Sequence, residues 1–229
     1  MNTKKKISLI IVIFEIIALI VVGFFAYRTV DSLLTKHEQE ELAAAKKAEE
    51  EEKLKQEELK SWNLILINPW NAVPDGYEVE IVEAERGFEV DARIYDAFAQ
   101  MMADCRAAGY SPLLIAGHRS HDAQQRLYDK ATNKADTALP YHSEHEIGLA
   151  VDIVDSGNSS LTDAQANTPA QQWLMKNCQN YGFILRYPKD KVEITGIVYE
   201  PWHYRYVGVK HAKKIMKKGI CLEEYLENY

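Results

Sequence analysis

The feature that most constrains this 229-residue chain is an apolar run near its N-terminus, residues 7–27, which contains one charged residue, Glu15. A helix needs about 20 such residues to cross a bilayer, whereas the apolar part of a cleaved signal peptide has roughly 7 to 15. No clear small-residue cleavage site follows the run. We therefore expect residues 1–28 to form a single-pass membrane anchor, with a cleaved signal peptide as the alternative.

Basic residues flank this run unequally. Lys4, Lys5 and Lys6 precede it, and only Arg28 lies close behind it. Because membrane segments keep the more basic flank in the cytoplasm, the N-terminus is predicted to be cytoplasmic. We expect a cell-membrane protein with its larger part outside the cytoplasm.

Residues 29–60 are predicted to be a charged helical stalk. From Thr35 to Lys60 the segment is rich in Ala, Glu, Lys, Leu and Gln and contains no Gly or Pro, which favours a helix. Its leucines are too sparse for a sustained heptad seam, so we expect a spacer rather than a coiled coil.

The remaining residues, 61–229, are long enough for one domain with its own core. The chain has 27 Lys and Arg against 34 Asp and Glu, a formal charge of −7, which argues against a nucleic-acid binder with a basic surface. No protein partner is evident from the sequence.

Strand-like and helix-like segments alternate irregularly in this domain. Predicted strands cover 64–67, 112–117, 147–154 and 198–207; predicted helices cover 90–108, the segment from Ser120 through Tyr128, a segment that begins at Pro169, and short stretches at the C-terminus. Without a regular βαβ rhythm, the pattern favours an α+β fold with a small, mostly antiparallel sheet flanked by helices.

Three cysteines make an odd number for an exported domain, so at least one is unpaired within the chain. Cys105 falls on the apolar stripe of the predicted 90–108 helix, where it is expected to be buried. Cys178 and Cys221 either form a disulfide or are small buried residues, and the sequence leaves both possibilities open.

Metal-ligating residue types gather around the third predicted strand. Asp152 is expected to project from a strand face kept small by Ala150. His145 lies seven residues earlier and requires a turn to reach the same face, which Gly148 permits.

In a second pair, Glu200 stands three residues before His203, and both fall within the last strand-like segment, 198–207. Two histidines and Asp152 suit a catalytic zinc with an open position for water, and leave Glu200 free as a general base. The same ligand set occurs in iron oxygenases, but these commonly have H-x-D spacing, so we favour zinc.

Three blocks, GHRSHDAQQRLY, SEHEIGLAVDIVD and EPWHYRYVG, resemble the signature blocks of the VanY-type zinc D-Ala-D-Ala carboxypeptidases, which are related to lysostaphin-like peptidases and the hedgehog domain. The resemblance covers most of residues 62–229. It implies that His145, Asp152 and His203 bind zinc and that Glu200 is the catalytic base.

The same resemblance implies roles at the substrate. Arg119 matches the arginine that holds the scissile carbonyl oxygen or the substrate carboxylate, and Gln124 and Ser143 match substrate-contacting positions. Glu146 stands where the family usually has Gln, and His118 stands where an aromatic residue usually precedes Arg-Ser. We expect these two departures to affect substrate preference rather than the metal site.

We therefore expect a membrane-anchored zinc D,D-carboxypeptidase that removes the C-terminal D-Ala from peptidoglycan stem peptides, acting on a wall precursor or on the wall itself. An L,D-carboxypeptidase acting on tetrapeptide stems is a second reading. A non-catalytic wall-binding module is a third, which the intact Glu200 disfavours, because a pure binding site needs no base.

Overall fold

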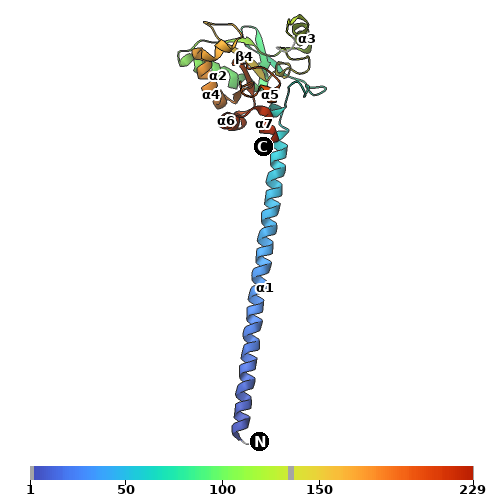
Figure 1. The fold of residues 1–229 in the computed structure, drawn as a ribbon, viewed down its shortest axis with the longest axis vertical. Coiled ribbons are helices and arrows are strands. Elements are labelled where there is room, and N and C mark those ends of the chain that lie inside the picture. The colour runs from blue at the N-terminus through green and yellow to red at the C-terminus, as the bar shows by residue number, and fades with distance from the viewer. Residues whose placement is uncertain (1–2, 134–136, 229) are drawn as a thin grey trace. The chain divides into compact units, whose positions relative to one another are not determined.

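The computed structural model describes residues 3–133 and 137–228, with side chains described at position 14 and from residue 16 onward. The chain divides into two compact units, Met1–Glu58 and Leu59–Tyr229. The described part of the first unit is helical throughout and belongs to α1 (Thr3–Leu59), drawn as one continuous helix in Figure 1. The helical character predicted for the apolar run and for the charged segment is thus confirmed.

The described apolar side chains of α1 are exposed as far as Leu54, among them Phe24 and Phe25 at 58% and 65%. By length and composition, the helix is apolar enough to cross a membrane. Among the described side chains of the first unit, none covers this apolar surface.

The second unit contains two antiparallel sheets. One is a hairpin of β1 (Ile81–Glu85) and β2 (Phe88–Asp91). The other has the order β3-β4-β6-β5 and consists of β3 (Pro112–Ala116), β4 (Ala150–Asp155), β6 (His203–Tyr206) and β5 (Phe183–Leu185).

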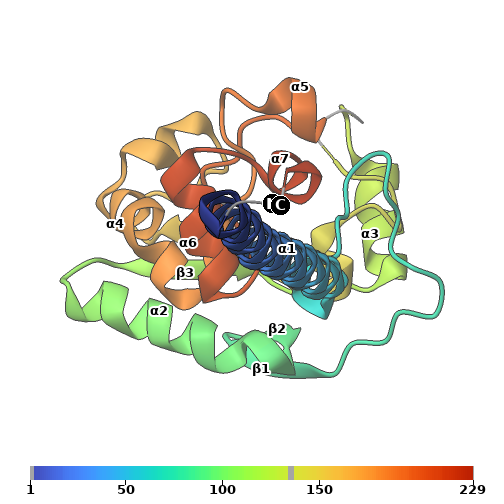
Figure 2. The same cartoon turned by 90° about the horizontal axis from the view of Figure 1, so that it is seen from below.

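Helices surround the four-stranded sheet, as in the α+β fold that was predicted. They are α2 (Tyr95–Ala107), α3 (His121–Lys130), α4 (Pro169–Asn177), α5 (Val192–Thr195), α6 (Val209–Lys218) and α7 (Leu222–Glu227). Within this unit, α4 and α3 lie on opposite sides in both views (Figures 1 and 2). Figure 2 shows β1 and β2 beside α2.

The two faces of the four-stranded sheet differ in chemistry. Val151 and Tyr204 are paired across β4 and β6 and belong to the main apolar core, with Phe98 of α2 and Leu174 of α4. Because side chains alternate along a strand, the next pair in register points to the other face. That pair is Asp152 and His203, so the sheet itself begins the functional site.

The predicted strand at 64–67 is wrong. Residues 62–64 form a 3₁₀ helix, and the following residues have no strand partner. The carbonyl of Ile65 instead accepts a hydrogen bond from Nη2 of Arg205 at 2.7 Å. A buried arginine thus satisfies backbone that a neighbouring strand would otherwise pair.

The predicted helix at 90–108 begins too early. Val90 and Asp91 end strand β2, a 3₁₀ helix follows at Ala92–Ile94, and α2 starts at Tyr95. The Asp91 side chain accepts a hydrogen bond from the backbone of Arg93 and so marks the turn into the helix.

The other predicted strands are found but are shorter. Strand β4 begins at Ala150 because the preceding residues form a 3₁₀ helix, and β6 begins at His203 because a turn holds the peptide NH of His203 on the Glu200 carbonyl at 3.2 Å. The helices predicted from Ser120 and Pro169 are present as α3 and α4.

All three cysteines are buried and free. Cys178 and Cys221 therefore do not form a disulfide in this structure, and burial raises the pKa of each of these thiols to about 12. Cys105 is fully buried on α2, as predicted.

Candidate active site

Strand register brings the first two candidate ligands together. Asp152 of β4 lies directly opposite His203 of β6, and Oδ1 of Asp152 is 3.1 Å from Nδ1 of His203. Cross-strand neighbours on one face have Cβ atoms roughly 5 Å apart, which is close enough for both side chains to share one ion.

His145 reaches the same point from a 3₁₀ helix, Glu144–Ile147. Gly148 ends this helix in a left-handed conformation with φ of +70°, and a Cβ at this position would lie 3.0 Å from the backbone nitrogen of Asp91. The turn thus requires glycine, as expected from the spacing. It places Nε2 of His145 3.4 Å from Oδ2 of Asp152.

In each of the two histidine rings, the nitrogen that points away from Asp152 is held by a hydrogen bond. Nδ1 of His145 is 2.7 Å from the carbonyl oxygen of Gly117, which can only accept, so Nδ1 carries the proton and Nε2 is free. Nε2 of His203 is 3.3 Å from Oε2 of Glu144, which leaves Nδ1 free. The two free nitrogens are those nearest Asp152.

This cluster fits a metal ion. Ligand atoms of His145, Asp152 and His203 all lie within 4.8 Å of one another, and all three residues are buried. Oδ1 of Asp152 is buried and accepts no hydrogen bond of suitable geometry from the described residues. A buried carboxylate oxygen is normally satisfied, so a cation is the natural partner for this one.

Glu200 stands beside the cluster. Its Oε2 is 3.6 Å from Nδ1 of His203, because the tight turn at Pro201 and Trp202 returns the chain to β6. Burial raises the pKa of Glu200 to about 7; His203 opposes this rise, and the charges of Asp152 and Glu144 add to it. A carboxylate in this position can accept or return a proton next to the ion site.

Arg119 lies on the other side of His145. Its Nη1 donates to Oε1 of Gln124 at 2.7 Å, and Gln124 is held in turn by the carbonyl of Ala138 at 2.7 Å. Within the described part of the chain, no carboxylate oxygen lies within 4.0 Å of this half-buried guanidinium. Arg119 is thus oriented by a neutral group and retains donors for an anion.

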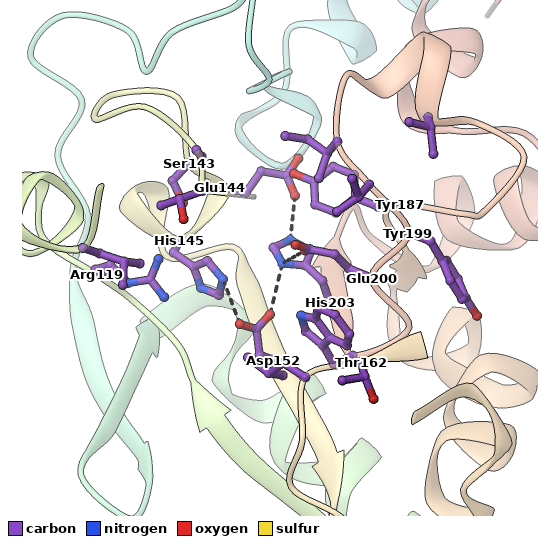
Figure 3. Close-up of a pocket in the computed structure, with 18 of the residues that line it drawn as sticks. Arg119, Ser143, Glu144, His145, Asp152, Thr162, Tyr187, Tyr199, Glu200 and His203 are labelled. Carbon is purple, nitrogen blue, oxygen red and sulfur yellow. Dashed lines mark hydrogen bonds and ion pairs between the residues drawn. The ribbon is translucent and has the colours of Figure 1, made fainter. Parts of the chain in front are cut away.

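One pocket of about 740 Å³ contains all seven residues singled out from the sequence. Figure 3 shows Arg119 and Ser143 on one side of the histidines and Glu200 and Tyr199 on the other. The structure therefore brings together the predicted site: Arg119, Gln124, Ser143, His145, Asp152, Glu200 and His203.

Sequence reasoning missed the importance of Glu144. Its carboxylate is fully buried and receives Nε of Arg186 at 2.7 Å and Nη1 of Arg205 at 2.8 Å, in addition to His203. Burial alone would raise the pKa of Glu144, but the two arginines hold it well below its usual range. The sequence signal was an acidic residue next to a candidate ligand, with no indication of its partners.

Tyr187 was also missed. Its ring centre lies 4.8 Å from that of His203, and it lines the pocket. It packs against the ring that carries the free Nδ1 nitrogen and so restricts the orientation of His203.

Glu146 and His118, the two residues that differ from the usual family pattern, do not line the pocket. Glu146 is buried, and its Oε2 contacts Nδ1 of His121 and the backbone NH of Tyr141. The backbone NH of His118 donates to the carbonyl of Glu89. Nδ1 of His142 lies 2.8 Å from the carbonyl oxygen of Asn68.

Comparison with known proteins agrees with this geometry. The profile of the VanY family, described as D-alanyl-D-alanine carboxypeptidase, matches residues 87–209, a span that is more than half of the chain and contains the whole cluster. The chain belongs to the VanY family. A D-alanyl-D-alanine carboxypeptidase of Enterococcus faecalis is 39% identical over 188 residues, which are 75% of this chain and 68% of the relative.

Solved VanY structures are similar as well. VanYB in complex with D-alanine-D-alanine is 40% identical, with a TM-score of 0.66, over 73% of this chain and 99% of that one. A vancomycin-resistance D,D-pentapeptidase VanY mutant in complex with Zn(II) has 40% identity and a TM-score of 0.64, over 72% and 99%. The LD-carboxypeptidase LdcB has 36% identity and a TM-score of 0.66, over 71% and 84%. The family resemblance and the carboxypeptidase class predicted from three sequence blocks are confirmed.

Proposed function

We propose that this protein is a membrane-anchored zinc D,D-carboxypeptidase that hydrolyses the C-terminal D-Ala of peptidoglycan stem peptides. The observation that carries this proposal is the content of one pocket: a three-ligand cluster, a separate carboxylate on Glu200, and Arg119, which forms no ion pair with the described residues. These are the groups that cleavage of a peptide with a free C-terminus requires.

Zinc is the cofactor that these ligands suit, and a VanY relative carries Zn(II). We assign His145, Asp152 and His203 as its ligands. When bound, zinc supplies Lewis acidity, which lowers the pKa of a water molecule and polarises a carbonyl oxygen. The Gly117 carbonyl and the Glu144 carboxylate hold the two rings so that their free nitrogens face the ion.

We assign Glu200 as the general base and then the general acid. Its carboxylate forms no hydrogen bond with the described residues, its ion-pair distance to Nδ1 of His203 is 3.6 Å, and the residue lines the pocket. It is positioned to accept the proton of the attacking water and to deliver it to the leaving amine nitrogen. The wall-binding module without catalysis is disfavoured by this residue.

We assign Arg119 as the residue that binds the negative charge of the substrate, and Gln124 and Ser143 as further substrate-binding residues of the same pocket. A guanidinium held in place stabilises charge that develops on a carbonyl oxygen, or grips a terminal carboxylate with two parallel hydrogen bonds. Gln124 fixes the plane of the guanidinium group, because its own amide nitrogen is bound to Ala138. Ser143 is almost fully buried in the same wall.

An L,D-carboxypeptidase is the second candidate. The similarity to LdcB, described as an LD-carboxypeptidase, favours it specifically. The two activities differ in the stereochemistry of the residue before the scissile bond, which is a matter of pocket shape rather than of the catalytic groups.

We further propose that residues 1–28 anchor the protein in the cell membrane, that residues 29–60 are a helical stalk, and that residues 61–229 act outside the cytoplasm on a wall precursor or wall peptide. The length and apolar composition of α1 and the cluster of lysines at its start support this arrangement.

Defined stem peptides test the proposed activity. The full-length protein, loaded with zinc, is incubated with a pentapeptide ending in D-Ala-D-Ala and with the matching tetrapeptide, and the products are identified by mass spectrometry. We expect loss of one D-Ala from the pentapeptide only. Trimming of the tetrapeptide alone would establish the L,D activity instead, and internal cleavage would exclude both.

A further inference from the structure

The pocket extends beyond the metal-ligand cluster on the side away from Arg119. Two chain segments line this far part: residues 161–163, which follow β4, and residues 187–199, between β5 and β6. Figure 3 shows Thr162 and Tyr199, one from each segment, across the cluster from Arg119. If the C-terminal end of a peptide lies at Arg119, the residues that precede the scissile bond extend into this part.

An ion pair joins the two segments. Nζ of Lys189 lies 3.2 Å from Oδ2 of Asp163 and 5.8 Å from the centre of the Tyr199 ring. The side chains of Lys189 and Asp163 are 76% and 64% exposed, so solvent screens the pair and either partner can exchange at little cost. The nearby lining residues Leu161 and Val198 are apolar, and Asp163 and Lys189 are therefore the charges that a substrate meets there.

We propose that this far part of the pocket binds the substrate residue before D-Ala-D-Ala, and that Asp163 and Lys189 recognise a side chain ending in both an ammonium and a carboxylate. The inference rests on the proposed peptidase function and adds the substrate class. The substrates proposed for the protein are thus stem peptides whose third residue is a diaminodicarboxylic acid.

Charge balance determines this choice. An incoming ammonium alone would compete with Lys189 for Asp163 and bring two cations together, and a carboxylate alone would bring two anions together. A zwitterionic side chain supplies one partner for each group, so that four charges alternate in sign. The apolar wall of Leu161, Val198 and Tyr199 suits the methylene chain that carries those groups.

Three pentapeptides that differ only at the third side chain test this proposal. The side chain is free diaminopimelate, its amide, which lacks the anion, or its N-acetyl form, which lacks the cation. For the full-length protein we expect kcat/KM to fall about two- to fivefold for each blocked form, the range of an exposed ion pair. In Lys189→Met, kcat/KM for the amide peptide should equal that for the free diaminopimelate peptide. In Asp163→Asn, kcat/KM for the N-acetyl peptide should equal that for the free peptide.

Lys213→Gln is the matched control, because Lys213 is an exposed lysine of α6 outside the pocket lining, and it should keep the wild-type order. Dissociation constants of the same peptides for the Glu200→Gln protein test the recognition apart from turnover. Equal constants for all three peptides, or a preference that survives both pocket variants, would overturn the proposal. Failure of the wild type to cleave any peptide, with the binding order intact, would instead contradict the proposed function.

Discussion

Glu144 accepts a hydrogen bond from Nε2 of His203 at 3.3 Å, and this contact determines which ring nitrogen faces Asp152. The carboxylate is fixed in turn by Arg186 and Arg205, both fully buried. A ligand histidine whose other nitrogen is bound to a carboxylate is both oriented and more basic. Glu144 is therefore a positioning residue in the proposed zinc site.

We predict that Glu144→Gln lowers zinc affinity about 10- to 100-fold, the usual effect of losing such a partner. Competition with a chromophoric chelator measures it. Glu223→Gln is the matched control, because Glu223 binds Arg186 at 2.7 Å in the same buried network and does not touch His203. Wild-type zinc affinity in the Glu144 variant would show that His203 needs no such partner.

Glu223 is predicted to stabilise the catalytic unit in a pH-dependent manner. Burial by itself would raise the pKa of Glu223, but Arg186 and Asn68 lower it. Since the folded-state pKa is depressed, the stabilisation is present above the unfolded pKa of about 4.3 and is lost as pH falls through the folded value.

Glu223→Gln should accordingly lower the free energy of unfolding by about 1–3 kcal/mol at pH 7, because a buried charged donor loses a partner. Urea unfolding followed by tryptophan fluorescence measures this at pH 7 and pH 3. The difference should shrink at pH 3, while exposed Glu227→Gln should have little effect at either pH. An equal loss at both pH values would mean that the charge of Glu223 is not responsible.

Arg119 is predicted to require a free substrate carboxylate. Converting the terminal carboxylate of the pentapeptide to an amide should reduce kcat/KM about tenfold or more, as expected for a hydrogen bond to a charged group. Arg119→Lys should cause a similar loss, because the ammonium keeps the charge but not the paired donors.

Exposed Arg126→Lys on α3 is the control for that substitution and should retain activity. If amidated or internally cross-linked peptides are cut as fast as free ones, the enzyme is an endopeptidase on the same scaffold.

The metal-ligand cluster and its base could be predicted from the sequence because the residues of each pair are only a few positions apart. Glu200 and His203 are three residues apart, and Gly148 lies between His145 and Asp152. Glu144 could not be predicted in the same way: Arg186 and Arg205 are 42 and 61 residues away, and only the folded sheet brings them to it.

The errors in secondary structure have the same origin. The segment at 64–67 is apolar, and Leu64 and Ile67 are buried, as in a strand. Its carbonyls, however, accept hydrogen bonds from Arg205 of β6 and from Arg186, which directly follows β5. The β1–β2 hairpin was missed, although Arg86 and Gly87 both have positive φ, at 59° and 80°, as a tight hairpin turn requires. The Arg-Gly dipeptide between alternating segments was the available signal.

The membrane anchor predicts a specific proteolysis result. Protease added to intact spheroplasts should remove the catalytic unit, because the proposed orientation places it outside and the stalk is an exposed helix. Immunoblotting with antibodies to residues 61–229 measures it. A soluble mature protein with a new N-terminus near residue 28 would show a cleaved signal peptide instead.

The separation of metal ligand from base is the central claim, and zinc content and turnover measured on the same preparations of Glu200→Gln and Asp152→Ala test it most directly. Glu200→Gln should keep one zinc per chain and lose about two to four orders of magnitude in kcat, because an amide cannot accept the proton of water. Asp152→Ala should lose zinc together with activity. Full zinc retention in Asp152→Ala, or lost metal with retained activity in Glu200→Gln, would contradict the assignment.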